Sequence, residues 1–169
     1  SSRDLANHRV MLSQHVNVSF PFTVEEIVAM GAGDHPRSIA APLVDAALAE
    51  LDLTPLRHRE LPTLSGGEQQ KLALGRALIR MPQVLFLDEP CANLDGRSTR
   101  EIEELLKNAT QAGTHIIMTT HDLGQARRLA GKVLFLLNGA LHEQGNASEF
   151  FVIPSTPEAR AFLNGDIIE

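Results

Sequence analysis

Apolar positions along the chain change period, and the change predicts helices in one region and strands in others. Over residues 20–80 the apolar residues recur at helical spacing, and two capping-box patterns each precede such a segment. The first is Thr23-x-x-Glu26 and the second is Ser65-x-x-Glu68. Because this region contains no strand pattern, we expect residues 20–80 to form a helical subdomain.

Short, uniformly apolar runs predict strands outside that region. Val10-Met11-Leu12 is expected to end a buried strand, and Val84-Leu85-Phe86-Leu87 to form a parallel strand buried on both faces. An amphipathic helix over 98–111 and a strand over 114–120 follow, and Asn138-Gly139 is typical of a type I′ hairpin turn. This alternation predicts an α/β fold with a parallel, doubly wound sheet.

The domain organisation follows from these two patterns. We expect residues 9–19 and 81–169 to form an α/β core into which the helical region 20–80 is inserted. The 169 residues suffice for one domain with a core, and 43% hydrophobic content is ordinary for a globular protein. The net charge of −6 argues against a general nucleic-acid binder. No apolar run approaches the roughly 20 residues that cross a bilayer, and the single Cys91 excludes an internal disulfide.

The segment Leu64-Ser65-Gly66-Gly67-Glu68-Gln69 combines a predicted helix start with two glycines. A helix N-terminus offers unpaired N–H groups and a partial positive charge, which favour a phosphate. The glycines would let a polyphosphate approach the backbone, and the serine hydroxyl could donate to a γ-phosphate oxygen. Taken alone, Ser-Gly-Gly is equally compatible with an ordinary capped helix.

Two adjacent carboxylates, Asp88 and Glu89, end the apolar run 84–87. Ligands of open α/β sheets bind at the carboxyl ends of the strands, so both side chains are expected at that edge. Their mutual repulsion would be offset by a bound Mg²⁺. Taken alone, Asp-Glu-Pro would equally describe a strand end where the chain turns. A lone histidine at a strand end, such as His121, is more often structural than catalytic.

Together these motifs resemble the signature and Walker B motifs of the ATP-binding cassette (ABC) ATPases. The resemblance implies a P-loop NTPase-type parallel sheet core, with ATP and Mg²⁺ as ligands. It implies that Asp88 holds Mg²⁺ through water, that Glu89 polarises the attacking water, and that His121 is the switch histidine, which hydrogen-bonds the γ-phosphate. It further implies that nucleotide is contacted by Ser65, Gly66, Gly67 and Glu68.

Two further residues acquire roles only through the resemblance. Gln14 matches the Q-loop glutamine, which contacts Mg²⁺ and the attacking water, and the segment 20–26 after it would touch a membrane subunit. Asp95, in Ala92-Asn93-Leu94-Asp95, matches the acid of the D-loop, which communicates across a dimer. The alternatives are a surface glutamine and a helix-entry turn, and we interpret Cys91 as a packing residue.

The family's phosphate-binding loop, G-x-x-x-x-G-K-[ST], does not occur in this sequence. The Gly131-Lys132 pair precedes Val133, and Ala126 stands where the earlier glycine would be. We therefore expect residues 1–169 to be a partial ABC ATPase domain, N-terminally truncated, with an incomplete core sheet. We also expect this chain alone to be inactive, although its parent hydrolyses ATP.

The resemblance implies the ATP-binding subunit of an ABC transporter, which couples ATP hydrolysis to solute transport, with import favoured by the unfused layout. The expected partners are a second ATPase subunit in a head-to-tail dimer and a membrane permease, with no nucleic acid. The expected location is peripheral, on the cytoplasmic face of the inner membrane. One alternative is an ABC ATPase of DNA repair or translation, and another is a non-catalytic interaction module. The transported substrate is not readable from these residues.

Overall fold

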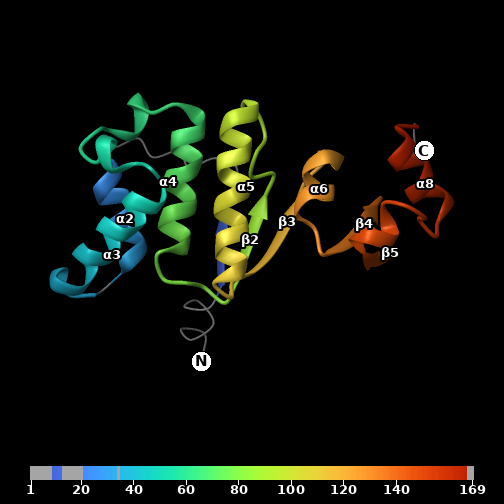
Figure 1. Cartoon of the computed structure of the whole chain (residues 1–169), viewed down its shortest axis with the longest axis horizontal. Coiled ribbons are helices and arrows are strands. Elements are labelled where there is room, and N and C mark those ends of the chain that lie inside the picture. The colour runs from blue at the N-terminus through green and yellow to red at the C-terminus, as the bar shows by residue number, and fades with distance from the viewer. Residues whose placement is uncertain (1–8, 13–20, 34, 167–169) are drawn as a thin grey trace. The chain divides into compact units, whose positions relative to one another are not determined.

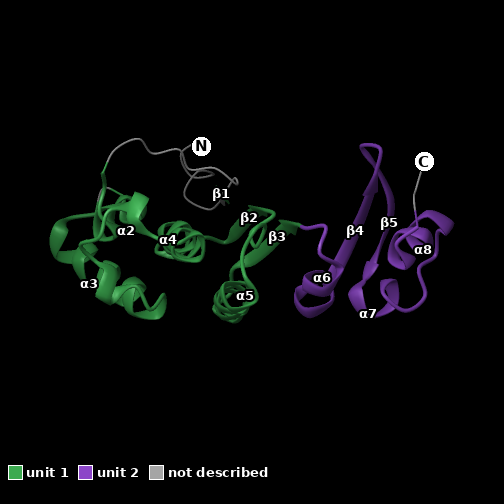
Figure 2. Ribbon diagram, turned by 90° about the horizontal axis from the view of Figure 1, so that it is seen from above, with its two compact units in different colours: residues 1–119 green, residues 120–169 purple. Residues whose placement is uncertain are grey.

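A parallel sheet lies at the centre of the first part of the chain. The computed structural model describes residues 9–12, 21–33 and 35–166, and it divides the chain into unit 1, residues 1–119, and unit 2, residues 120–169 (Figure 2). In unit 1, β1 (Arg9–Leu12), β2 (Val84–Asp88) and β3 (His115–Thr119) pair in the order β1-β2-β3, and both pairings are parallel. The predicted α/β fold with a parallel sheet is confirmed.

The burial of β2 differs from the prediction. Leu85 and Leu87 are buried, whereas Val84 and Phe86 between them are partly exposed. Successive side chains of a strand point to opposite faces, and among the described residues one face of β2 is covered completely and the other in part. The expectation of a strand buried on both faces is therefore wrong for the described part of the chain.

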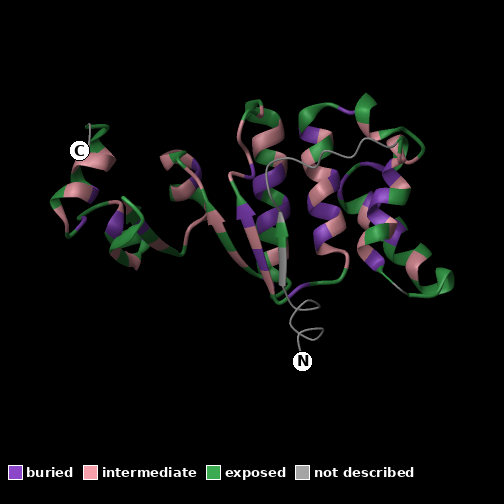
Figure 3. Ribbon diagram, turned by 180° about the vertical axis from the view of Figure 1, so that it is seen from behind, coloured by how far each residue is buried: buried purple, intermediate pink, exposed green. Residues whose placement is uncertain are grey.

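Helices dominate the region between β1 and β2 (Figure 1). These are α2 (Val24–Ala32), α3 (Arg37–Glu50) and α4 (Gly66–Leu78), with the short 3₁₀ turns η1 (Thr54–Leu56) and η2 (Leu61–Thr63). Both predicted capping boxes are present, at Thr23 and Ser65. The helices pack around fully buried side chains, and Figure 3 shows buried residues along α2, α4, α5 and β2. The subdomain boundaries at 20 and 80 remain a prediction.

Helix α5 (Gly96–Gln111) begins two residues before the predicted start at Ser98. The reason is local, because the Asp95 carboxylate accepts hydrogen bonds from the backbone N–H groups of Arg97 and Ser98 and so caps the helix earlier. After the helix, Gly113 has φ +103°, a left-handed conformation that glycine adopts at low cost. The chain then enters β3.

Unit 2 has its own small core. Its elements are α6 (Leu123–Leu129), β4 (Lys132–Leu137), β5 (Ala140–Asn146), α7 (Ala147–Phe150) and α8 (Pro157–Asn164). Phe135, Phe150 and Ala159 are buried together. Asn138 and Gly139 have φ +50° and +76°, as the predicted type I′ turn requires. None of the described helices has the length and apolar content that a membrane span requires.

Candidate functional site

Among the described residues of unit 1, the predicted nucleotide-binding and metal residues stand at or next to the start of α4, the end of β2 and the start of α5. The strands β2 and β3 end at the edge where α4 and α5 begin (Figure 1). This arrangement follows from the connections, because a parallel strand that feeds a helix places its carboxyl end beside the N-terminus of that helix. The start of α4 and the end of β2 thus share this edge.

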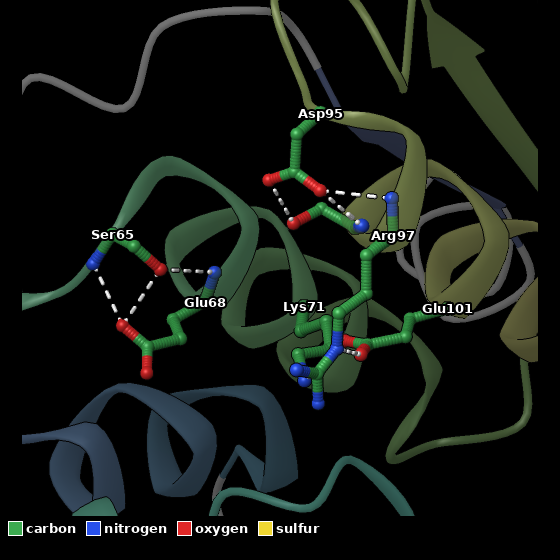
Figure 4. Close-up of polar contacts among 7 residues, drawn as sticks. Ser65, Glu68, Lys71, Asp95, Arg97 and Glu101 are labelled. Carbon is green, nitrogen blue, oxygen red and sulfur yellow. Dashed lines mark hydrogen bonds and ion pairs between the residues drawn. The ribbon is translucent and has the colours of Figure 1, made fainter.

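Ser65 and Glu68 form a reciprocal capping box at the start of α4 (Figure 4). The backbone N–H and the hydroxyl of Ser65 donate to Glu68 Oε2 at 2.7 and 2.8 Å, and the Glu68 N–H donates to Ser65 Oγ at 3.4 Å. The hydrogen bond from the Ser65 N–H, followed by that from its hydroxyl, lowers the pKa of Glu68 below its ordinary value. The serine hydroxyl that was predicted to serve a phosphate is thus directed at a carboxylate.

The two glycines of the segment have different surroundings. A Cβ added to Gly67 would lie 2.4 Å from Ser98 Oγ and 2.8 Å from Ser98 Cβ, so α4 contacts α5 too closely there for any side chain. A Cβ on Gly66 would meet only Leu94 Cδ2, at 3.7 Å. Gly67 is buried and Gly66 is exposed. Gly67 therefore sets the helix spacing, whereas Gly66 leaves backbone open at the helix end.

Asp95 lies at the start of α5 and caps it (Figure 4). Asp95 Oδ1 accepts from the N–H groups of Arg97 and Ser98 at 2.8 and 2.9 Å, and Oδ2 accepts from the Ser98 hydroxyl at 2.9 Å. The hydrogen bonds from Ser98, first from its N–H and then from its hydroxyl, lower the pKa of Asp95. The helix-entry role is thus observed, and the role across a dimer remains a prediction.

Asp88, the predicted Mg²⁺ residue, ends β2 and pairs in register with Thr119 of β3. The Thr119 hydroxyl donates to Asp88 Oδ1 at 2.5 Å, and the aspartate is exposed. No cluster of three or more possible metal ligands occurs among the described residues. Mg²⁺ commonly uses one or two carboxylates together with substrate phosphates and water. An exposed, oriented carboxylate at the strand end fits such an ion.

Glu89 adopts an unusual backbone conformation directly after β2. Its φ is +47°, and its N–H donates to Thr119 O at 3.2 Å and Thr119 Oγ1 at 3.3 Å. A non-glycine residue in the left-handed region is uncommon, and such conformations concentrate at functional sites. The Asp88 carboxylate and the Glu89 backbone N–H are therefore both hydrogen-bonded to Thr119, which fixes the chain where the predicted general base begins.

Two further residues, His121 and Gln14, were predicted for the site. His121 belongs to unit 2, where it is exposed and precedes the Asp122 cap of α6. Its role beside Glu89 therefore stays a prediction. Gln14 lies outside the described residues, so its contact with Mg²⁺ also stays a prediction.

Comparison with known proteins identifies the family. A family model described as ABC transporter matches residues 1–92, which is more than half of the chain. The chain belongs to the ABC transporter family. The predicted resemblance is thereby confirmed, and both the signature and the Walker B segments lie within the matched residues.

The chain is similar to several import ATP-binding proteins of this family. It is 46% identical over 153 residues to the hemin import ATP-binding protein HmuV of Nitrobacter winogradskyi, which covers 86% of the chain and 57% of that protein. It is 39% identical over 122 residues to the phosphate import ATP-binding protein PstB 2 of Natronomonas pharaonis, covering 72% of the chain and 43% of that protein. The chain thus spans little more than half the length of the hemin import proteins that it matches.

Solved structures give the same fold. CbiO1 from Clostridium perfringens, described as part of the ABC transporter complex cbiONQ, has a TM-score of 0.79 at 30% identity and covers 89% of this chain and 62% of that one. An inward-facing putative metal-chelate type ABC transporter has a TM-score of 0.80 at 27% identity, covering 94% and 64%. The fold class of the ABC family chain is therefore shown by structure as well as by sequence.

Three residues of the site were not predicted from the sequence. Thr119 orients Asp88, Ser98 contacts Gly67, and Lys71 joins α4 to Glu101 of α5. Thr119 could have been predicted, because it stands near the end of the predicted strand 114–120, and a hydroxyl there lies beside Asp88 when the two strands pair in parallel. The other two depend on how α4 packs against α5, which no local pattern encodes.

Proposed function

We propose that the complete protein that contains this chain is the ATP-hydrolysing subunit of an ABC importer. The observation that carries the proposal is the 46% identity to a hemin import ATP-binding protein over 86% of the chain. The geometry supports it, because the capped start of α4 and the carboxylate end of β2 share one edge of unit 1 (Figure 1).

The roles follow the chemistry of that edge. Asp88, oriented by Thr119, holds a hydrated Mg²⁺, which neutralises phosphate charge when bound. Glu89 acts as the general base that polarises the attacking water, and His121 and Gln14 orient that water. The start of α4, residues 65–68, closes on ATP held by a second ATPase subunit in a head-to-tail dimer.

A mainly apolar pocket of unit 1 is suited to the permease. It lies between α2, η2 and α4, and it is lined chiefly by Ile27, Met30, Leu61, Leu72 and Arg76. Met30 is 49% exposed, which is high for a large apolar side chain in a helix. We assign this pocket to the membrane permease, because it adjoins the segment after Gln14. The subunit would then be peripheral, on the cytoplasmic face of the membrane.

The proposed cargo is hemin or a related metal chelate, by analogy with the hemin import relatives. The test is ATP hydrolysis and solute uptake by the complete gene product, reconstituted with its permease and binding protein in proteoliposomes. Glu89→Gln is the matched inactive variant, with an expected loss of about 10²- to 10⁴-fold in hydrolysis. Met30→Glu should weaken the complex with the permease and leave basal hydrolysis unchanged.

The outcomes separate the candidate functions. Hydrolysis that Glu89→Gln abolishes, with uptake of hemin but not phosphate, supports the full proposal. Hydrolysis without uptake of any solute points to an ABC ATPase outside transport. Absence of both hydrolysis and ATP binding by the complete protein points to a non-catalytic interaction module.

A further inference from the structure

Lys71 joins α4 to α5 one turn beyond the signature segment. Lys71 Nζ donates to Glu101 Oε2 at 2.9 Å, and the two residues lie on different helices (Figure 4). The Lys71 side chain is only 13% exposed, so its charge is largely removed from water. The Glu101 side chain is 35% exposed, so the pair is partly shielded and is screened less than a fully exposed pair.

The pair is in register with the glycine contact described above. The Gly67–Ser98 contact lies one turn before the ion pair on both helices. On α4, Lys71 follows Gly67 by four residues, and on α5, Glu101 follows Ser98 by three. Residues at these spacings lie on one helix face. The two contacts therefore follow one seam between parallel helices, and the ion pair fixes the axial position of α4 along that seam.

Glu101 has a second cation, which provides an internal comparison. Arg97 Nε donates to Glu101 Oε1 at 2.9 Å, but Arg97 lies on the same helix and its side chain is 90% exposed. The hydrogen bond from Lys71, followed by that from Arg97, lowers the pKa of Glu101. Both cations neutralise the same carboxylate, yet only Lys71 connects it to the helix that carries the signature segment.

We propose that Lys71 is a positioning residue that, through Glu101, holds the first turn of α4 against Leu94 and Ser98 and thereby sets where Ser65 meets nucleotide. This inference rests on the proposed function, because Ser65 would act on ATP bound by the partner subunit. Sliding α4 along the seam would move Ser65 without disturbing the strands that carry Asp88 and Glu89. Misplacement of a reacting group by about 1 Å can cost about 10²-fold in rate.

The test uses the complete gene product and three matched variants. Lys71→Met keeps the apolar stem and removes the charge, Lys71→Arg keeps the charge, and Arg97→Met removes the other cation from Glu101. Lys71→Met should lower kcat for ATP hydrolysis roughly 10-fold, with KM for ATP within about twofold. Lys71→Arg should restore most of kcat, and Arg97→Met should match wild type. Val44→Ala, in the buried face of α3, serves as a destabilised control away from the seam.

Each outcome decides the proposal. The proposal is overturned if Lys71→Met has the kcat of wild type. It is also overturned if Arg97→Met loses as much kcat as Lys71→Met, or if Val44→Ala does so at a matched loss of stability. If the wild-type protein hydrolyses no ATP, the proposed function is wrong, and a double-mutant cycle of Lys71→Met and Glu101→Gln in urea then tests the link alone. Additive effects in that cycle overturn the link, and coupling between them supports it.

Discussion

Replacing Gly67 with alanine should destabilise the protein, although alanine is the better helix former. Alanine in a helix interior is favoured over glycine by about 1 kcal/mol. Here its Cβ would lie 2.4 Å from Ser98 Oγ and 2.8 Å from Ser98 Cβ, so the two helices must separate. Overpacking of this kind costs about 1–3 kcal/mol. Set against the propensity gain, we expect a net loss of up to about 2 kcal/mol in the free energy of unfolding.

The neighbouring glycine supplies the control. A Cβ on Gly66 would meet Leu94 Cδ2 at 3.7 Å, an ordinary contact, so Gly66→Ala should change stability by less than about 0.5 kcal/mol. Urea unfolding followed by far-ultraviolet circular dichroism measures both variants, since the chain has no Trp or Tyr to serve as a fluorescence probe. A phosphate-binding role alone would predict no difference in stability between the two glycines.

The cause of the loss can be tested directly. Ser98→Gly removes both atoms that crowd the new methyl group, so it should recover much of the stability lost in Gly67→Ala. Coupling of roughly 1 kcal/mol in this cycle is expected for residues in direct contact. Equal unfolding of Gly67→Ala and wild type, or strictly additive effects with Ser98→Gly, would show that close packing of α4 on α5 is not what the glycine provides.

Three further predictions concern the same edge. Ser65→Ala should cost about 1 kcal/mol of unfolding free energy through the lost cap, and Ser65→Thr should retain most of it in the same urea assay. Contacts with Ser65 lower the pKa of Glu68 below the ordinary 4.5, so the stabilisation of the folded state by this carboxylate is present above pH 4.5 and is lost as pH falls through the folded-state pKa. The free energy of unfolding should therefore fall less steeply with acid in Glu68→Gln than in wild type. An unchanged slope would contradict this. Thr119→Val should raise the Mg²⁺ concentration needed for half-maximal ATP hydrolysis by the complete protein roughly 10-fold, because Asp88 loses its orienting donor. Thr119→Ser should leave that concentration unchanged.

Local features of the fold were predictable from the sequence. The capping boxes at Thr23 and Ser65 involve residues three positions apart, so the pattern that identifies them also contains both hydrogen-bonding partners. The turn at Asn138-Gly139 was likewise fixed by the two residues that tolerate positive φ. The start of α5 lies two residues before the predicted start, because Asp95, for which a helix-entry turn is the alternative role, caps the helix through the N–H groups of Arg97 and Ser98.

Features that depend on tertiary packing were not predictable. Asp88 and Thr119 are 31 residues apart in sequence and meet through strand register, whereas Lys71 and Glu101 are 30 residues apart and meet through helix packing. The partial exposure of Phe86 also depends on what covers the sheet. Motif order was sufficient to predict the family, since each motif is a short local string, but it could not predict which side chains hold those motifs in position.

The start of α4 already holds an anion before any nucleotide arrives. The N-terminal ends of α4 and α5 lie side by side at the Gly67–Ser98 contact, and each carries a partial positive charge. The carboxylates of Glu68 and Asp95 offset this repulsion, and the N–H groups that they accept from lower the pKa of both. A phosphate that takes the Ser65 hydroxyl must therefore replace Glu68 Oε2 as its acceptor. The proposed nucleotide binding would then exchange one anion for another, and its strength would depend on how readily the Glu68 carboxylate releases the Ser65 hydroxyl.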